Sequence, residues 1–264
     1  MAEGHTTITL TTDFGLRDPW VGSMKGVGLF LAPQANIVDI SHEVEAGNIF
    51  EGAFILANTY GSFPKGTIHV AVVDPGVGSD RDPIVILTDN YFLVGPDNGI
   101  LSLAVQNANV KRIIKVTNDD FFQKPISSTF HGRDIFMPVA GYITRGVGLH
   151  DIGEDINDFV KIDYPHLKKD KDSVEGEVIY VDHFGNLITN ITSESVQHLI
   201  DAGKAEIEIN SIKVSGVDDS YSDKGEGATV ALIGSLGFLE IASYKDRAVD
   251  KASAKIGDKV TVRG

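Results

Sequence analysis

Apolar and polar positions alternate along residues 1–160 in short runs that predict strands and helices in turn. Thr7–Thr11 and Asn36–Ile40 are rich in β-branched residues and predict two strands. Ile68–Val73 is a nearly continuous apolar run, as expected of a parallel strand that is buried on both faces. Asn48–Tyr60 carries its apolar residues at helical spacing. This alternation predicts an α/β/α layered domain with a mainly parallel sheet.

Three further strands and two further helices complete the predicted N-terminal domain. One helix is expected to run towards Leu31, with Asp18 as its N-cap and Pro19 at its first position. The second is expected over His131–Thr144. The strands are predicted at Ile84–Thr88, Tyr91–Val94 and Arg112–Val116.

The pattern changes after the first domain. Charged and polar residues dominate from Asp158 to Asp172, so we interpret residues 161–172 as a linker between domains at residues 1–160 and 173–264. A short helix is predicted near Ser193–Ile200 among short strands separated by polar turns. We therefore expect a small antiparallel β-barrel-like domain or a sandwich. The strands are predicted at Val174–Val181, Ala205–Ile209, Ile212–Val214, Ala228–Ile233, Phe238–Ala242 and Lys259–Val262.

Charge and composition restrict the partners. A net charge of −14 argues against a nucleic-acid partner and against an anionic membrane surface, because both attract basic proteins. The absence of cysteine excludes disulfides, thiolate metal sites and cysteine nucleophiles. Residues 1–5 are polar, and we find neither a signal-peptide core nor an apolar run that could span a bilayer. We therefore expect a cytoplasmic protein.

Four polar clusters follow predicted strands, at the positions where open α/β sheets bind ligands. In the first, Asp13 leaves a strand and could accept hydrogen bonds from a sugar's hydroxyl pair, although this segment alone favours a turn Asp and a capping Asp18. In the second, Asp74 follows a buried strand, two glycines allow close backbone approach, and Arg81 follows. A catalytic pair and a structural ion pair that closes a loop both fit this cluster.

The other two clusters contain histidines. His131 precedes a predicted helix, where it could act as a general base near pH 7 or simply cap or pack. Asp182 and Asn186 flank a turn in the second domain that needs no function. The scattered histidines show no zinc-binding spacing, and no Gly-x-Ser-x-Gly elbow occurs, so we predict no metal site.

Taken together, five motifs in order along nearly the whole chain resemble the S-adenosylmethionine (SAM) hydroxide adenosyltransferases, relatives of fluorinating and chlorinating enzymes. The resemblance implies an N-terminal α/β domain, a C-terminal β-barrel-like domain, and SAM as a substrate that needs no cofactor. It also implies a homotrimer with active sites between one subunit's first domain and a neighbour's second. The motifs are Thr-Asp-Phe-Gly at 12–15, Val-Asp-Pro-Gly-Val-Gly at 73–78, Gly-Pro-Asp-Asn-Gly at 95–99, Phe-His-Gly-Arg-Asp at 130–134 and Asp-His-Phe-Gly-Asn at 182–186.

The resemblance also implies roles for individual residues. Asp74, Arg81 and His131 match the set that positions and activates water. His131 is the better candidate for accepting the proton, and Asp74 stays open as a second candidate for this role. Asp13 is implied to hold the ribose hydroxyls, and Asp18 and Asp182 the methionine ammonium. Asn186 is implied to contact the adenine, and Ser235 the methionine carboxylate. Phe50 and Phe130 are implied to pack around the nucleoside.

Two positions bear on the nucleophile. The fluorinating branch has a tyrosine in place of Asp74 and a halide-binding serine in place of Gly132, so this chain resembles the enzymes that use water. Leu236 stands where the halogenases carry a carboxylate-binding arginine, so Ser235 lacks that neighbour here. We therefore expect hydrolysis of SAM to adenosine and methionine. The alternatives are a halogenase, a non-catalytic sensor of SAM or adenosine, and a metal-dependent phosphohydrolase that uses the same Asp and His residues.

Overall fold

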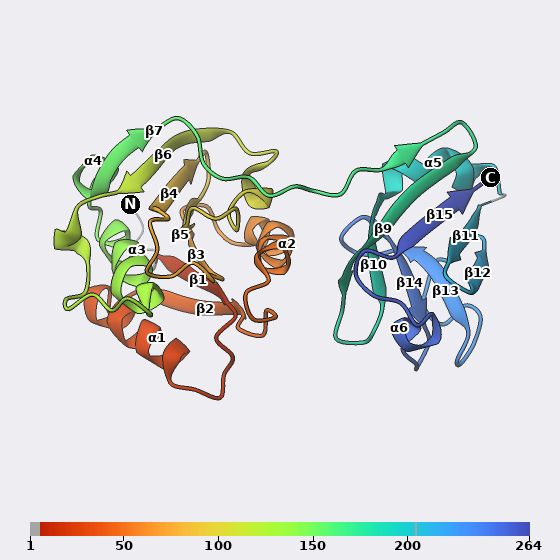
Figure 1. The fold of residues 1–264 in the computed structure, drawn as a ribbon, viewed down its shortest axis with the longest axis horizontal. Coiled ribbons are helices and arrows are strands. Elements are labelled where there is room, and N and C mark those ends of the chain that lie inside the picture. Colours follow the sequence, from red (N-terminus) through yellow and green to blue (C-terminus); the bar gives the residue numbers. More distant parts are fainter. Residues whose placement is uncertain (1–5, 204) are drawn as a thin grey trace. The chain divides into compact units, whose positions relative to one another are not determined.

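The computed structural model describes residues 6–203 and 205–264, which form two compact units (Figure 1). The first unit extends to Ile162 and the second begins at Asp163. Each unit contains its own sheet and its own hydrophobic core, so each is described separately.

A seven-stranded mixed sheet forms the centre of the first unit, in the order β2-β1-β3-β5-β4-β6-β7. Strands β2, β1, β3 and β5 run parallel, whereas β4, β6 and β7 join by antiparallel pairing. The predicted mainly parallel sheet with helices is therefore confirmed. The strands are β1 (Thr7–Thr12), β2 (Asn36–Ser41), β3 (Ile68–Val72), β4 (Pro83–Thr88), β5 (Phe92–Pro96), β6 (Val110–Val116) and β7 (Gly153–Ile156).

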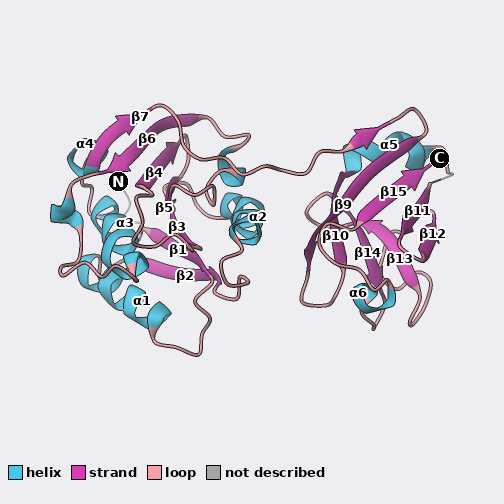
Figure 2. Ribbon diagram, viewed as in Figure 1, coloured by secondary structure: helices cyan, strands magenta, loops and turns pink. Residues whose placement is uncertain are grey.

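Helices cover both faces of this sheet (Figure 2). Because side chains alternate along a strand, Val70 and Val72 of β3 pack with Met24 and Met137 on one face. Ala71 and Val73 belong to the separate core on the other face. The helices of the unit are α1 (Trp20–Leu31), α2 (Ile49–Thr59), α3 (Met137–Thr144) and α4 (Leu149–Ile152), with 3₁₀ turns at Tyr60–Ser62, Leu103–Val105 and Asp119–Phe121.

Helix α1 begins differently from the prediction. It starts at Trp20, and Pro19 rather than Asp18 occupies the N-cap position, without a side-chain capping bond. The predicted capping role of Asp18 is therefore wrong. The proline nitrogen carries no hydrogen, and the Pro19 carbonyl instead accepts the first bond of the helix, from Ser23 N at 2.9 Å.

The predicted helix over His131–Thr144 consists of a π-helical turn followed by an α-helix. Gly132–Phe136 form a π-helical turn, and regular α-helix begins at Met137. Pro138 has no amide hydrogen, so it cannot donate to the carbonyl of Asp134 four residues earlier. That carbonyl instead accepts from Gln123 N at 2.8 Å. The widened turn lies directly after His131.

The second unit is an eight-stranded antiparallel sheet in the order β12-β11-β15-β9-β10-β14-β13, with β8 paired to β9. The predicted antiparallel, barrel-like domain is confirmed. The strands are β8 (Lys168–Lys169), β9 (Ser173–Val181), β10 (Leu187–Thr192), β11 (Glu206–Ile209), β12 (Ile212–Ser215), β13 (Thr229–Ile233), β14 (Phe238–Ser243) and β15 (Lys259–Arg263), and the helices are α5 (Ser193–Asp201) and α6 (Ala248–Lys251).

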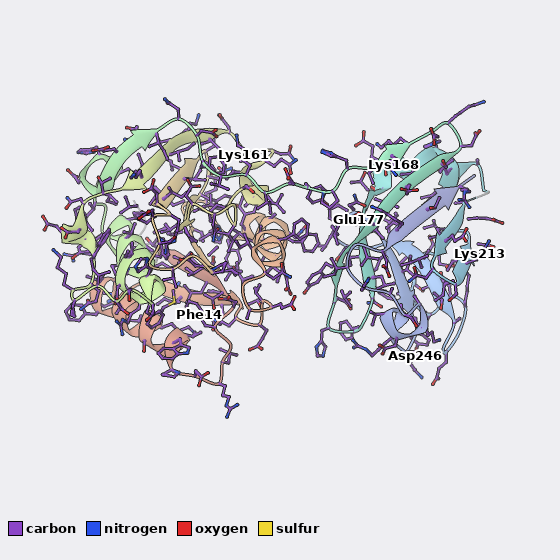
Figure 3. All side chains as sticks on the ribbon, in the orientation of Figure 1. Phe14, Lys161, Lys168, Glu177, Lys213 and Asp246 are labelled. Carbon is purple, nitrogen blue, oxygen red and sulfur yellow. The ribbon has the colours of Figure 1, made fainter. Side chains whose placement is uncertain are left out.

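Charged side chains lie on the surface of each unit, as Lys161, Lys168 and Lys213 do in Figure 3. Within residues 6–203 and 205–264, no helix combines the length and the apolar character needed to cross a membrane.

One buried histidine makes the fold sensitive to acid. His69 on β3 is 0% exposed, and its Nδ1 lies 2.7 Å from the hydroxyl of Thr9. The rings of Tyr60, Phe63 and Tyr91 surround it at 5.2–5.9 Å. Burial lowers the pKa of His69 from 6.5 to about 4, because the apolar surroundings disfavour the charged ring.

We expect the free energy of unfolding to fall as the pH drops from 6.5 towards 4, because only the unfolded chain then protonates His69. The loss should reach about 3 kcal/mol. His69→Gln cannot titrate and should lose less stability over this interval in urea melts. His150→Gln, at an exposed histidine, serves as the control. Parallel pH dependence in wild type and His69→Gln would contradict the assignment.

Candidate active site

A cavity of about 320 Å³ opens in the first unit where β1 and β3 end. Asp13 follows β1, Asp74 lies just beyond β3, and His131 precedes the π-helical turn. The parallel strands β1 and β3 bring their carboxyl ends to one edge of the sheet, which explains why Asp13 and Asp74 meet. His131 does not directly follow a strand, and its contact with Arg81 places it beside them. The cavity is lined by Asp13, Phe14, Trp20, Val72, Asp74, Pro75, Val77, Thr129, Phe130, His131 and Gly132.

Asp74 and Arg81 form a buried ion pair beneath the cavity. Arg81 Nε lies 3.1 Å from Asp74 Oδ1 and 2.9 Å from Oδ2, and Arg81 Nη2 also donates to Oδ2. The side chains are only 4% (Asp74) and 10% (Arg81) exposed. A charge-assisted pair with several hydrogen bonds has a fixed geometry, because each buried charge needs its partner.

Arg81 also holds His131. Its Nη2 lies 2.8 Å from His131 Nδ1, and since a guanidinium can only donate, Nδ1 must accept. The neutral ring therefore carries its proton on Nε2. Burial lowers the pKa of His131, as does the positive charge of Arg81, against the opposing effect of Asp74 and Asp134.

Two tight contacts bring the loops of this site together. Gly78 has a φ of +79°, and a Cβ there would lie 2.5 Å from the Ser128 carbonyl oxygen, so only glycine fits. Asp134 is fully buried, and its Oδ2 accepts a hydrogen bond from Ser127 N at 2.8 Å. Its Oδ1 lies 2.6 Å from Arg133 Nε. The segment before His131 is thus fixed from both sides.

A backbone amide holds Asp13, and a buried histidine holds the residue before it. Its Oδ2 accepts from Gly47 N at 2.9 Å, leaving its other oxygen available to a ligand. The preceding Thr12 hydroxyl lies 2.8 Å from Nδ1 of the buried His42. His42 Nε2 in turn lies 3.0 Å from Asp39 Oδ1. Burial raises the pKa of Asp39, but hydrogen bonds from Lys25 and His42 outweigh this effect, so the pKa is lowered overall.

Aromatic side chains form one wall of the cavity. Phe130 makes edge-to-face contacts with Phe14 and Trp20, at centroid distances of 5.8 and 5.5 Å. We did not single out Phe14 or Trp20 from the sequence as site residues. Trp20 is the chain's single tryptophan and remains exposed beside a polar cluster, which is a usable signal for a binding residue.

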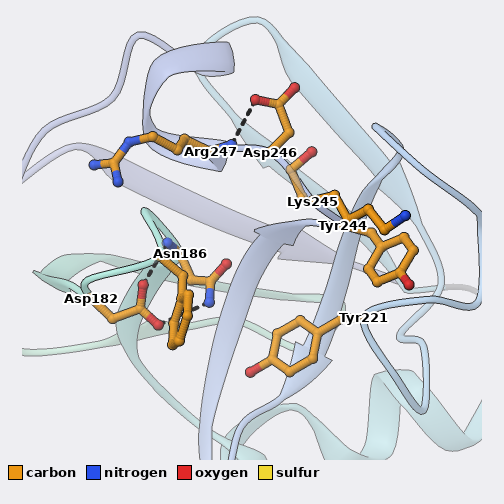
Figure 4. Close-up of a pocket in the computed structure, with 9 residues that line it drawn as sticks. Asp182, Asn186, Tyr221, Tyr244, Lys245, Asp246 and Arg247 are labelled. Atoms are coloured by element: carbon orange, nitrogen blue, oxygen red, sulfur yellow. Dashed lines mark hydrogen bonds between the residues drawn. The ribbon is translucent and has the colours of Figure 1, made fainter.

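A second cavity, of about 520 Å³, lies within the second unit (Figure 4). Asp182 accepts from Asn186 twice, through the backbone N at 2.8 Å and through Nδ2 at 2.9 Å. The amide oxygen of Asn186 therefore remains available to a ligand. Tyr221, Tyr244 and Arg247 also line this cavity and were missed by the motif analysis.

The remaining predicted contacts lie outside both sets of lining residues. Asp18 is exposed after β1, Phe50 lies in the first turn of α2, and Ser235 is exposed in the turn between β13 and β14. Across the part of the chain that the structure describes, no group of three or more acidic or histidine side chains is arranged to hold a metal ion.

Family models match both units. Residues 8–153 match the SAM hydroxide adenosyltransferase N-terminal domain, and residues 176–261 match the C-terminal domain of the same family. The chain belongs to the SAM hydroxide adenosyltransferase family.

Relatives and a solved structure are similar to this chain over nearly its whole length. The chain is 39% identical to an (R)-S-adenosyl-L-methionine hydrolase of Methanocaldococcus jannaschii, covering 97% of this chain and 95% of the relative. It is 25% identical to a fluorinase of Nocardia brasiliensis over 97% and 96% of the two chains. A crystal structure of a conserved protein from Thermotoga maritima superposes with a TM-score of 0.92 at 33% identity, covering 98% of this chain and 100% of that one.

We expect NMR titration of the His131 ring to find the Nε2–H tautomer at pH 7.5 and a pKa below the ordinary value of 6.5. Arg81→Met should raise the pKa of His131, because it removes a repulsive charge and leaves Asp74 and Asp134 in place. The ring signal is assigned by its absence in His131→Gln, and His150 in the same spectra is the control. An Nδ1–H tautomer would contradict the Arg81 contact.

Proposed function

We propose that this protein hydrolyses S-adenosyl-L-methionine to adenosine and L-methionine. We further propose that its substrate has the R configuration at sulfur, because the relatives are named (R)-S-adenosyl-L-methionine hydrolases. The observation that carries the proposal is the largely buried Asp74–Arg81 pair, with His131 bonded to it, at a cavity of about 320 Å³ in a chain of this family. Asp74 and His131 line the cavity, and Arg81 joins them from behind.

Water attacks the ribose C5′ in this reaction. The new bond joins the water oxygen to C5′, the C5′–S bond breaks, and its electron pair converts the sulfonium into the neutral thioether of methionine. The leaving group needs no proton. The site must therefore orient water in line with the C5′–S bond and accept one proton from it.

We assign the proton to Asp74 instead of His131, which the motif analysis favoured. His131 Nδ1 accepts from Arg81, so the ring presents Nε2–H, which can only donate to the water oxygen. Asp74 supplies a carboxylate at the same wall of the cavity. A carboxylate suffices as a base, because the water protons become strongly acidic as the C–O bond forms.

The remaining side chains suit the substrate. Asp13 has a free carboxylate oxygen for the ribose hydroxyls, and Phe130 with Trp20 provides an apolar wall for the nucleoside. In the second unit Asn186 suits adenine, and Asp182 suits the ammonium group. We also retain Asp18, Phe50 and Ser235 as proposed contacts on the family resemblance alone.

Local packing also favours water over halide as the nucleophile. A Cβ at Gly132 would lie 3.2 Å from both Met24 Sδ and the Phe14 ring. The halide-binding serine of the fluorinating branch would therefore require Phe14 or Met24 to move. Asp74 likewise stands where that branch has a tyrosine.

The first test is to incubate the protein with SAM in halide-free buffer containing EDTA and to separate the products. We expect adenosine and methionine in equal amounts, formed from the R epimer of an epimeric mixture. Asp74→Asn and His131→Ala should each lower the rate on the order of 10²-fold or more. Bound but intact SAM would instead indicate a sensor, and a halogenated nucleoside on adding chloride or fluoride would indicate a halogenase.

We further propose a homotrimer in which the second unit of one subunit completes the site of its neighbour. The support is that the proposed contacts divide between two separately folded units, with the catalytic set in the first and Asp182 and Asn186 in the second. Exposed apolar side chains, including Leu16, Phe30 and Phe184, provide surface for subunit contacts.

Mixing two inactive variants tests this arrangement. Asp74→Asn disables the first unit and Asn186→Ala the second, so a site built within one chain stays defective in every subunit. In trimers reassembled at random from equal amounts, about a quarter of shared sites should combine two intact units. Recovery of activity and a trimeric mass in light scattering are expected. A trimer without recovery, or a monomeric mass, would reject the shared site.

A further inference from the structure

The Gly-Pro-Asp-Asn-Gly motif at residues 95–99 lines neither cavity, yet it lies directly beside the catalytic loop. It spans the end of β5 and the turn that follows. β5 pairs in parallel with β3, so both strands reach the same edge of the sheet. β3 continues there into Val73 and Asp74.

Asn98 holds the chain just before Asp74. Its Nδ2 donates to the Val73 carbonyl oxygen at 2.9 Å, and its Oδ1 accepts from Ile100 N at 3.2 Å. Because the peptide unit is planar, fixing the Val73 carbonyl also fixes the direction in which the Asp74 Cα leaves the strand. The orientation of the catalytic carboxylate therefore depends on this amide.

The neighbouring residue holds the other end of the same loop. Asp97 N donates to the Asp82 carbonyl oxygen at 2.8 Å, and Asp82 directly follows Arg81. The motif thus binds the backbone immediately before Asp74 and immediately after Arg81. The loop between these two anchors carries the ion pair that holds His131.

The two glycines allow the motif to lie this close. A Cβ at Gly95 would be 2.5 Å from the Ala71 carbonyl oxygen, and Gly99 has a φ of +100°. Both positions therefore exclude larger residues. The Asp97 side chain has a separate task, since its Oδ1 accepts from Val160 N at 2.7 Å near the end of the first unit.

We infer that Asn98 is a positioning residue that acts on catalysis through the Val73 carbonyl and Asp74. It fixes one end of the 74–81 loop while the adjacent Asp97 amide fixes the other, so the Asp74–Arg81 pair is held against His131. The activity test of this inference rests on the proposed hydrolase function, but its structural test does not.

Asn98→Ala tests the inference against Asn118→Ala as a matched control. Asn118 makes the same two bonds elsewhere in the unit, to the Asp151 carbonyl oxygen at 2.9 Å and from Asp120 N at 3.1 Å. We expect Asn98→Ala to lower kcat about tenfold or more with KM changed less than about twofold, because a small misplacement of a catalytic group is costly. Asn118→Ala should leave both constants within about twofold.

A double-mutant cycle separates positioning from a general loss of structure. In the Asp74→Asn background, Asn98→Ala should lower kcat by less than about threefold, because the group that it positions is already disabled. An equal loss in both backgrounds, or an equal loss in Asn118→Ala, would overturn the inference.

The Arg81 Nε–H signal in NMR supplies the test that needs no activity. This signal, assigned by its absence in Arg81→Lys, should shift in Asn98→Ala and stay in place in Asn118→Ala. An unchanged signal in Asn98→Ala would overturn the inference. If wild type fails to hydrolyse SAM, the proposed function falls, and this comparison still decides whether Asn98 positions the loop.

Discussion

The guanidinium of Arg81 is the group on which the rest of the site depends. It binds the carboxylate of Asp74 and donates to His131 Nδ1 at 2.8 Å, in surroundings that leave only 10% of its side chain exposed. A guanidinium stays charged and only donates, so both partners must accept. This single constraint sets the tautomer of His131, and it is the basis for proposing Asp74 as the proton acceptor.

Such an arrangement works only if its segments are held within a fraction of an ångström. The ends of the parallel strands β1 and β3 bring Asp13 and Asp74 together, Arg81 joins His131 to them, and close backbone contacts then fix the loops. Gly78 lets the 74–81 loop touch Ser128, while Asn98 and Asp97 anchor the ends of that loop. Gly78, Gly95, Gly99 and Asn98 in the motifs therefore serve the geometry of the site.

Much of the fold followed from local patterns because burial imposes them. The run Ile68–Val73 is apolar since both faces of β3 are covered, and its position was predicted within a residue. Strand β10, Leu187–Thr192, was missed because its Thr and Asn residues resemble a turn. Asn190 is buried there only because Glu177 N and the Pro165 carbonyl satisfy its amide, and these partners are distant in sequence.

The sequence by itself determined the class of fold and supplied the candidate site residues, because motifs and periodicity are local properties of a chain. The tertiary structure alone decided the hydrogen-bond partners of those residues and the tautomer of His131. Arg81 and His131 are 50 positions apart, and only their contact shows which ring nitrogen is occupied. Aromatic partners such as Trp20 were also decided in three dimensions, because packing joins side chains that no motif places together.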